Sequence, residues 1–298
     1  MHIDLTTSYI GIISLLIFAV AYVAVMAEEF SHLRKSKPVI ISASLIWGLI
    51  AFHYTSFGDQ YSKEVEHAFK HNLLEFAELF LFLLAAMTYI NALQERRVFE
   101  VVRYKLISKG YNFRKLFLLT GIITFFLSPI ADNLTTALVM CSVLLACGKG
   151  NPKFLSLGCI NIVVAANAGG AFSPFGDITT LMVWQAGIVE FFTFFNLFVP
   201  SVVNYVIPAT IMYFFISNEK PDVSTDVVMM KRGGKVIIFL GLFTIFLAVN
   251  FHNVLHLPPM LGMMFGLGIL GFYSFYLKLT FDKDIDDEKF DFLRKVSK

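Results

Sequence analysis

The sequence predicts an all-α polytopic membrane protein with about seven full spans, one of them a broken helix, and one re-entrant helical hairpin. Hydrophobic residues make up 57% of the 298 residues and charged residues only 15%, whereas a soluble domain is about 25% charged. The apolar residues occur in runs near the length that a spanning helix needs, about 20 residues. Lys and Arg fall mainly in alternate connections, as the positive-inside rule requires.

Six apolar runs are long enough to cross a bilayer as single helices: residues 9–27, 39–57, 73–92, 194–216, 236–251 and 260–279. Residues 116–127 and 134–147 are shorter. We expect them to form the two arms of the re-entrant hairpin, with two full spans and a tight turn as the alternative. Residues 154–171 and 179–189 are the two arms of one segment whose interior, residues 169–177, contains three Gly and one Pro, which predicts one helix broken at 169–177.

The basic connections place the N-terminus outside and the C-terminal tail in the cytoplasm. The N-terminus has no basic segment before its first apolar run, so we expect that run to be retained and not cleaved as a signal peptide. Residues 94–115 interleave Val, Leu and Ile with Arg and Lys. This pattern predicts a helix on the cytoplasmic interface, with a solvated basic loop as the alternative.

This layout divides the chain into four parts. Residues 1–115 are expected to be scaffold-like spans with the interfacial helix, residues 116–190 the transport element, residues 191–281 the later spans, and residues 282–298 a cytoplasmic tail. Gly262, Gly266 and Gly268 indicate close helix packing in the last span. The three cysteines, Cys141, Cys147 and Cys159, lie in apolar stretches without a CxxC pair, so we interpret them as small buried hydrophobic residues.

The two breaks in the transport element resemble each other. The first is SPIADNLTT, from Ser128 to Thr136, and the second is SPFGDITT, from Ser173 to Thr180. Each has Ser-Pro, an Asp four residues after the Ser, and then a Thr pair. Such a recurrence within one chain is unlikely to arise by chance, and it predicts two matched structural elements.

Each part of this repeated motif has a physical role. Pro is expected to stop the preceding helix because it cannot continue the hydrogen-bond ladder. Asp or Asn then caps the next helix, with the Thr pair in its first turn. Carboxylates, hydroxyls and freed carbonyls are the oxygen ligands that hard cations prefer. We therefore predict an ion site at midplane depth, whose residues are Ser128, Asp132, Asn133, Thr135, Thr136, Ser173, Asp177, Thr179 and Thr180. The alternative is that Asp132 and Asp177 are ordinary helix caps near the interface.

Other polar residues within spans carry weaker signals. Glu75 and Glu78 lie on one face of the third span, where they either line the ion path or anchor the helix at the interface. Asn167, next to the second break, is a better ligand candidate than Asn161. The pairs His67/His71 and His252/His256 have helical metal-ligand spacing but no third ligand. No phosphate-binding loop or nucleophile–base arrangement is legible, so neither an enzyme nor a cofactor is predicted, and the charge pattern does not indicate nucleic-acid binding.

Five segments carry a family resemblance: residues 34–38, 73–92, 128–140, 161–185 and 257–264, which read RKSKP, LLEFAELFLFLLAAMTYINA, SPIADNLTTALVM, NIVVAANAGGAFSPFGDITTLMVWQ and LPPMLGMM. They resemble the NhaD-type sodium/proton antiporters of the ion transporter superfamily. The resemblance implies exchange of Na⁺ or Li⁺ for H⁺ across a bacterial inner membrane, and a scaffold domain beside a transport domain, usually in a homodimer. By motif, Asp132, Asn133, Thr135, Thr136, Asp177, Thr179 and Thr180 match the family's ion-site elements.

The chain departs from the family in length, because family members carry a second, inverted repeat with its own Asp-bearing hairpin. This sequence stops about where that repeat is expected to begin, which predicts a truncated chain or one that needs a complementing second half. Three hypotheses therefore stand. The chain is a cation/proton antiporter, a transporter of an anion such as a dicarboxylate or arsenite, or a membrane fragment that does not transport by itself.

Overall fold

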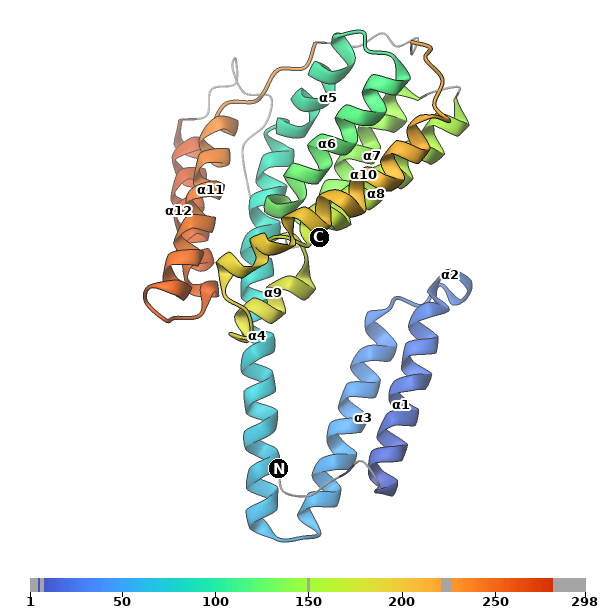
Figure 1. The fold of residues 1–298 in the computed structure, drawn as a ribbon. Helices are drawn as coiled ribbons and strands as arrows, with labels where there is room; N and C mark the ends of the chain where they lie inside the picture. Colours follow the sequence, from blue (N-terminus) through green and yellow to red (C-terminus); the bar gives the residue numbers. More distant parts are fainter. Residues whose placement is uncertain (1–4, 6–7, 149–150, 221–226, 281–298) are drawn as a thin grey trace. The chain divides into compact units, whose positions relative to one another are not determined.

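The computed structural model describes residues 5, 8–148, 151–220 and 227–280 of the chain, and within them the regular structure is helical (Figure 1). Eight helical stretches are long and apolar enough to cross a membrane by length and composition. They are Tyr9–Met26, Ser36–Thr55, Tyr61–Glu95, Phe113–Ala131, Pro152–Gly170, Phe191–Tyr213, Gly234–Asn253 and Pro259–Leu279. The predicted all-helical polytopic membrane class is therefore confirmed at this level. The division into scaffold, transport element, later spans and tail stays a prediction.

The chain forms two compact units, residues 1–78 and residues 79–298. The first unit holds α1 (Tyr9–Met26), the short α2 (Glu28–Ser31), α3 (Ser36–Thr55) and the beginning of α4 (Asp59–Glu95). Helices α1 and α3 pack on each other, and Ser8 starts α1 by accepting a 3.1 Å hydrogen bond from the Gly11 amide. Most apolar side chains of α1 and α3 are exposed in the isolated chain, as expected for helices that face lipid.

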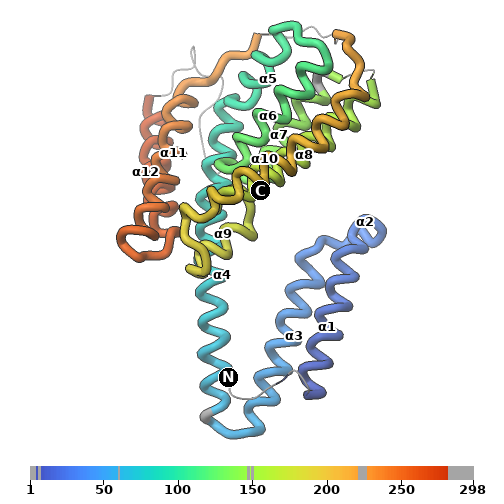
Figure 2. The backbone as a smooth tube through the Cα atoms, in the orientation of Figure 1, coloured from blue at the N-terminus to red at the C-terminus, as the bar shows by residue number. Residues whose placement is uncertain are grey.

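Helix α4 is longer than the predicted span at 73–92. It begins at Asp59 and has 37 residues, so residues 59–72, expected to connect two spans, are helical. The sequence supports this extension, because Glu66 and Lys70 form an i,i+4 ion pair at 2.6 Å of the kind that stabilises exposed helix. The prediction from hydropathy missed residues 59–72 because they are polar. Their residue types do not disfavour helix. Figure 2 traces α4 as one continuous helix.

The second unit continues from α4 through eight further helices and one 3₁₀ segment. They are α5 (Val98–Ser108), α6 (Phe113–Ala131), α7 (Asn133–Cys147), α8 (Pro152–Gly170), α9 (Ile178–Gln185), η1 (Phe191–Leu197), α10 (Phe198–Tyr213), α11 (Gly234–Asn253) and α12 (Pro259–Leu279). Helices α6, α8 and α10 pack together, α7 packs on α6 and α8, and α11 pairs with α12. Phe125 and Phe172, which precede the two breaks, are buried in one cluster with Tyr205 of α10.

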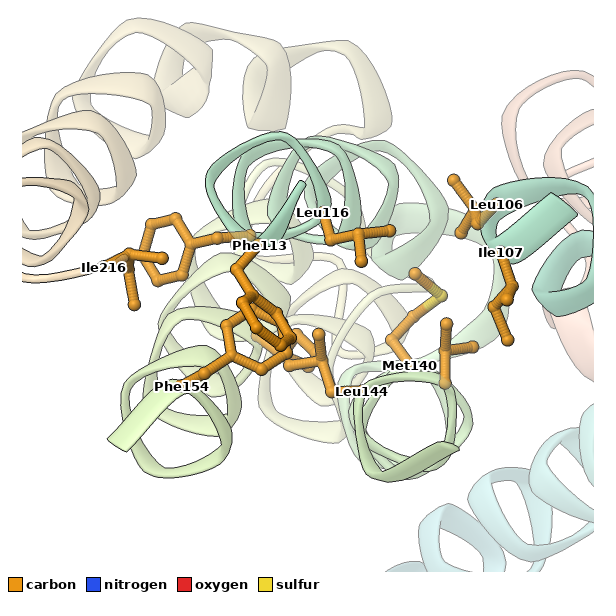
Figure 3. Packing of buried hydrophobic residues seen from close by; sticks show 11 residues of the cluster. Leu106, Ile107, Phe113, Leu116, Met140, Leu144, Phe154 and Ile216 are labelled. Atoms are coloured by element: carbon orange, nitrogen blue, oxygen red, sulfur yellow. The ribbon is translucent and has the colours of Figure 1, made fainter. Parts of the chain in front are cut away.

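Helix α5 confirms the helix predicted within residues 94–115. Its apolar side chains Leu106 and Ile107 are buried in a cluster with Phe113, Met140 and Leu144 of α6 and α7 (Figure 3). The apolar side of this helix therefore packs on the protein at these two residues. Its position on a membrane interface stays a prediction.

The hairpin region differs from the prediction in its first arm. Helix α6 has 19 residues where an arm at 116–127 was expected, and this difference accounts for the eighth candidate span. Pro129 does not stop α6, which continues to Ala131, because a proline in the last turn removes one intrahelical hydrogen bond without preventing the final residues from remaining helical. The second arm, α7, begins at Asn133, one residue before the expected start, and ends at the expected Cys147. Helix α9 is only eight residues long and ends before the predicted residue 189.

The glycines of α12 allow α11 to approach closely. A Cβ at Gly262 would lie 2.5 Å from the Ala248 Cα, and one at Gly266 would lie 2.1 Å from the Thr244 Oγ1. The prediction of close packing is confirmed at these two positions. It is wrong at Gly268, where an added Cβ meets nothing within 4 Å, because this residue lies on a part of the helix surface that does not meet α11.

This difference predicts opposite outcomes for two alanine substitutions. Gly262→Ala should destabilise the protein by about 1–3 kcal/mol, because the added methyl meets backbone atoms that cannot move aside. Gly268→Ala is the matched control and should be neutral or stabilising by up to about 1 kcal/mol through helix propensity. Thermal unfolding in detergent measures both. Equal destabilisation by the two variants would contradict the packing described for α11 and α12.

Candidate functional site

The two helix breaks meet in the second unit. The Ser173 hydroxyl of the second break donates a 2.9 Å hydrogen bond to the Pro129 carbonyl of the first. The Asn133 backbone amide donates to the Gly176 carbonyl, also at 2.9 Å. These two hydrogen bonds run in opposite directions between the breaks, so the repeated motif holds both in one place.

Asp132 lies between α6 and α7 and caps α7. Its Oδ1 accepts a 2.8 Å hydrogen bond from the Thr135 amide, which confirms the predicted cap. Its Oδ2 is buried and accepts no hydrogen bond from the described residues. The backbone of Asp132 has φ 55° and ψ 157°, a region that only Gly adopts readily and that costs other residues about 1–3 kcal/mol.

Asp177 caps α9 in the second break, as predicted, but its surroundings differ from those of Asp132. Its Oδ1 accepts hydrogen bonds of 2.9 Å from both the amide and the hydroxyl of Thr179. Its Oδ2 accepts a 2.5 Å hydrogen bond from the Asn133 side-chain amide. Thr180 closes the turn by donating to the carbonyls of Ser173 and Asp177. The Asp177 carboxylate is therefore well supplied with donors, whereas one Asp132 oxygen has none.

The remaining motif residues surround the same point. Ser128 is fully buried and donates a 2.6 Å hydrogen bond to the Ala166 carbonyl of α8. The Thr136 hydroxyl is buried and has no partner among the described residues. Asn167 is exposed, but its Oδ1 lies 3.4 Å from the Asn133 side-chain nitrogen. Every residue predicted from the two motifs, together with Asn167, thus lies in or beside one polar cluster.

Pro129 of α6 and Gly169 of α8 both affect the Phe125 carbonyl, next to this cluster. Pro129 has no N–H to donate to the carbonyl four residues earlier, that of Phe125. Gly169 of α8 packs against this same carbonyl, since a Cβ at Gly169 would lie 2.1 Å from the Phe125 oxygen. The proline therefore changes the hydrogen bonding of α6 at a point where α8 approaches closely, and its role is not the helix termination expected from the sequence.

The other predicted pathway residues, Glu75 and Glu78, lie on α4 in the first unit. The Glu75 carboxylate is 3.3 Å from the His71 Nε2, and the Glu78 side chain is partly buried. Their role as pathway or anchor stays a prediction. Within the described part of the chain, no group of three His, Cys, Asp or Glu side chains is placed to hold a metal ion.

Cys141 and Cys159 are half-buried free thiols on α7 and α8. The Cys147 side chain, which was assigned the same role, lies outside the described residues. Sequence reasoning missed the backbone partners of the site, which are the carbonyls of Pro129, Ala166 and Gly176. It also missed the contribution of Gly169. The signal that could have indicated Gly169 is its place in a Gly-Gly pair directly before the second break.

The cluster is rich in oxygen and contains two carboxyl groups. Two carboxylates lie at the N-termini of α7 and α9, and neither repeated motif contains Lys or Arg. A buried carboxylate oxygen without a donor is stabilised by gaining a proton or a cation, because either one offsets the cost of removing it from water. Asp132 therefore has one oxygen available to take up a proton or to contact a small cation.

Comparison with known proteins gives a consistent result. The family model described as "Citrate transporter" matches residues 10–278. The chain is 54% identical over 283 residues to the Na(+)/H(+) antiporter NhaD of Vibrio cholerae, covering 95% of this chain and 59% of that protein. It is 55% identical over 278 residues to the Na(+)/H(+) antiporter NhaD of Alkalimonas amylolytica, covering 93% and 57%.

A more distant relative is Sodium/proton antiporter 1 of Arabidopsis thaliana, which is 31% identical over 260 residues, covering 86% of this chain and 44% of that protein. The chain thus spans less than two thirds of the length of the curated relatives that it matches. These families consist of transporters and not of enzymes. The chain belongs to the citrate transporter family, and it is similar to the NhaD type of sodium/proton antiporters.

Proposed function

We propose that this chain exchanges Na⁺ or Li⁺ for H⁺ by competition of the cation and the proton for Asp132. The observation that carries the proposal is the Asp132 Oδ2, which is buried and has no hydrogen-bond donor. Burial disfavours the charged form of a carboxylate unless a partner compensates it. Either a proton or a cation supplies that compensation, and the two compete for the same lone pairs.

The neighbouring groups support different roles for the two aspartates. Thr136 lies one helical turn after Asp132, on the same face of α7, and its unpartnered hydroxyl offers a further oxygen ligand. Asp177 accepts hydrogen bonds from Thr179 and Asn133, whereas one oxygen of Asp132 has no donor. We therefore assign the exchange between proton and cation to Asp132, and to Asp177 the role of a second carboxylate held in place beside it.

A second candidate is transport of an organic anion, which the description of the matching family model favours. Helix N-termini attract anions, and α7 and α9 both begin at the site. The N-termini of these two helices are already capped by Asp132 and Asp177, and a bound anion would meet two carboxylates with no motif Lys or Arg to balance them. The local charge therefore favours a cation.

The proposal includes the topology expected from the basic connections, with the N-terminus outside and the C-terminus in the cytoplasm of a bacterial inner membrane. The tail at 282–298 lies outside the described residues. We further propose a homodimer or a complementing second half as partner, as the resemblance implies. Competition at one carboxylate produces exchange only when the site opens to one side of the membrane at a time.

Ion-dependent thermal stability of the purified chain in detergent tests the substrate class. NaCl or LiCl should raise the unfolding temperature above that in choline chloride, because a ligand that binds the folded state stabilises it, by about 2.7 kcal/mol at a hundredfold excess over its Kd. Choline citrate should give no such shift. Asp132→Asn should lose the Na⁺ shift, whereas the control Asp59→Asn, at the exposed start of α4, should retain it. A Na⁺ shift that survives Asp132→Asn, or a shift with citrate alone, would overturn the proposal.

A further inference from the structure

A second polar group lies between α6, α8 and α10, away from the two breaks. Asn161 of α8 is fully buried, and its side-chain nitrogen donates a 2.9 Å hydrogen bond to the Phe117 carbonyl of α6. The Tyr205 hydroxyl of α10 also contacts the Asn161 side chain. The Asn161 Oδ1 accepts no hydrogen bond from the described residues. A buried amide oxygen in this state costs about 1–3 kcal/mol.

Gly121 of α6 has no side chain, and this leaves room for the Asn161 and Tyr205 side chains. A Cβ at Gly121 would lie 2.3 Å from the Tyr205 hydroxyl oxygen and 2.4 Å from the Asn161 side-chain nitrogen. An apolar residue at position 161 and a larger one at 121 would fill the interface without leaving a polar atom unpaired. Packing alone therefore does not account for the Asn161 oxygen.

Hydroxyl groups connect this position with the site at the breaks. Thr120, Thr124 and Ser128 follow one another at intervals of four residues on one face of α6, and all three are fully buried. Each donates its hydrogen to a backbone carbonyl: Thr120 to Leu116, Thr124 to Thr120, and Ser128 to Ala166. Their oxygens thus keep lone pairs that can accept. From Gly121 to Ser128 the helix rises by about 10 Å.

We propose that the Asn161 Oδ1 and the Tyr205 hydroxyl form a second, weak binding position for the transported monovalent cation, reached from Asp132 along the hydroxyl-bearing face of α6. This inference rests on the proposed function. Neutral oxygens suit such a position, because an ion that moves through a protein must bind well enough to enter and weakly enough to leave. The unpaired amide oxygen and the glycine that lets Asn161 and Tyr205 approach α6 are then features of the ion path.

Cysteine labelling tests the position without requiring exchange. In a chain with Cys141, Cys147 and Cys159 replaced by Ala, Asn161→Cys should react with a positively charged methanethiosulfonate reagent. The control is Ile162→Cys, because Ile162 is also fully buried on α8 but packs in an apolar cluster. We expect labelling at position 161 to be faster by about tenfold, since a path lined for cations concentrates them. Na⁺ should slow it, because Na⁺ at Asp132 occupies the same path even though the variant lacks the Asn161 Oδ1. A negatively charged reagent should show no such preference.

Equal labelling at positions 161 and 162, or no effect of Na⁺ at 161, would overturn the inference even if Asp132-dependent exchange is found. Labelling at 161 that Na⁺ slows, in a chain without exchange, would support the position and count against antiport. If Asn161→Cys fails to fold, Tyr205→Phe removes only the hydroxyl and keeps the ring that stacks on Phe125.

This phenylalanine variant should leave unchanged the tight phase of Na⁺-dependent thermal stabilisation, which reports Asp132, and raise the Na⁺ concentration for half-maximal effect of the weaker phase by about tenfold, the loss expected for one hydrogen-bonding oxygen at a charge. Tyr22→Phe, on the exposed surface of α1, is the control and should leave that concentration unchanged. An unchanged concentration in Tyr205→Phe would remove Tyr205 from the binding position.

Discussion

Asp132→Gly is expected to abolish Na⁺-driven proton movement while making the folded chain more stable. Exchange falls to background because the buried carboxylate is gone. Stability rises because Gly adopts the φ 55°, ψ 157° backbone of this position without the strain of about 1–3 kcal/mol that another residue bears there. Loss of the helix cap offsets only a few tenths of a kcal/mol when Gly replaces Asp. Acidification of everted vesicles and thermal unfolding in detergent measure the two effects.

Two further variants serve as controls for this result. Asp132→Asn keeps the strained backbone, so it should lose exchange without the gain in stability. Asp177→Gly should lose stability, because Asp177 has an extended backbone with φ −144°, where Gly relieves nothing, and its carboxylate accepts three hydrogen bonds. If Asp132→Gly retains exchange, or is less stable than Asp177→Gly, then Asp132 does not have the role assigned to it.

Gly169→Ala is expected to have the largest structural effect of any single methyl group added at the site. The new Cβ would lie 2.1 Å from the Phe125 oxygen and 3.0 Å from its Cα. Because both are backbone atoms of α6, the helices must separate, which typically costs about 1–3 kcal/mol and occasionally more. Their separation should also move Ser128 from the Ala166 carbonyl and weaken Na⁺ binding.

Thermal unfolding of this variant with and without Na⁺ measures both consequences. Gly48→Ala is the matched control, because a Cβ at Gly48 of α3 meets nothing within 4 Å, and it should retain stability and the Na⁺ shift. A Gly169→Ala protein as stable as the wild type, with an undiminished Na⁺ shift, would show that close contact between α6 and α8 is unnecessary for the site.

The repeated motif allowed much of the site to be predicted. Matching Ser-Pro and Asp positions are a local signal, and capping by Asp132 and Asp177 follows from local geometry. The motif also predicted that the two breaks belong together, and the hydrogen bond from Ser173 to the Pro129 carbonyl confirms this. Hydropathy predicted the spans because lipid requires long apolar helices.

Other features could not be predicted because they depend on tertiary contacts or on backbone conformation. The link between Asn133 and Asp177 joins residues 44 positions apart, and nothing in either motif specifies that pairing. Whether an Asp132 oxygen lacks a hydrogen-bond donor depends on the side chains and backbone packed around it, and the motif itself does not specify these. The extension of α4 was missed for a different reason, since a polar helix leaves no hydropathy signal even where its residues favour helix.

In the proposed exchange, the two helices that begin at the breaks also determine how much charge the site takes up when both aspartates are ionised. Each helix N-terminus is equivalent to about half a positive elementary charge, so the two together offset about half of the negative charge on Asp132 and Asp177. What is left matches one monovalent ion or one proton. A divalent ion would leave an excess positive charge in a medium of low dielectric constant, where uncompensated charge is costly. The capping geometry thereby favours ions of single valence.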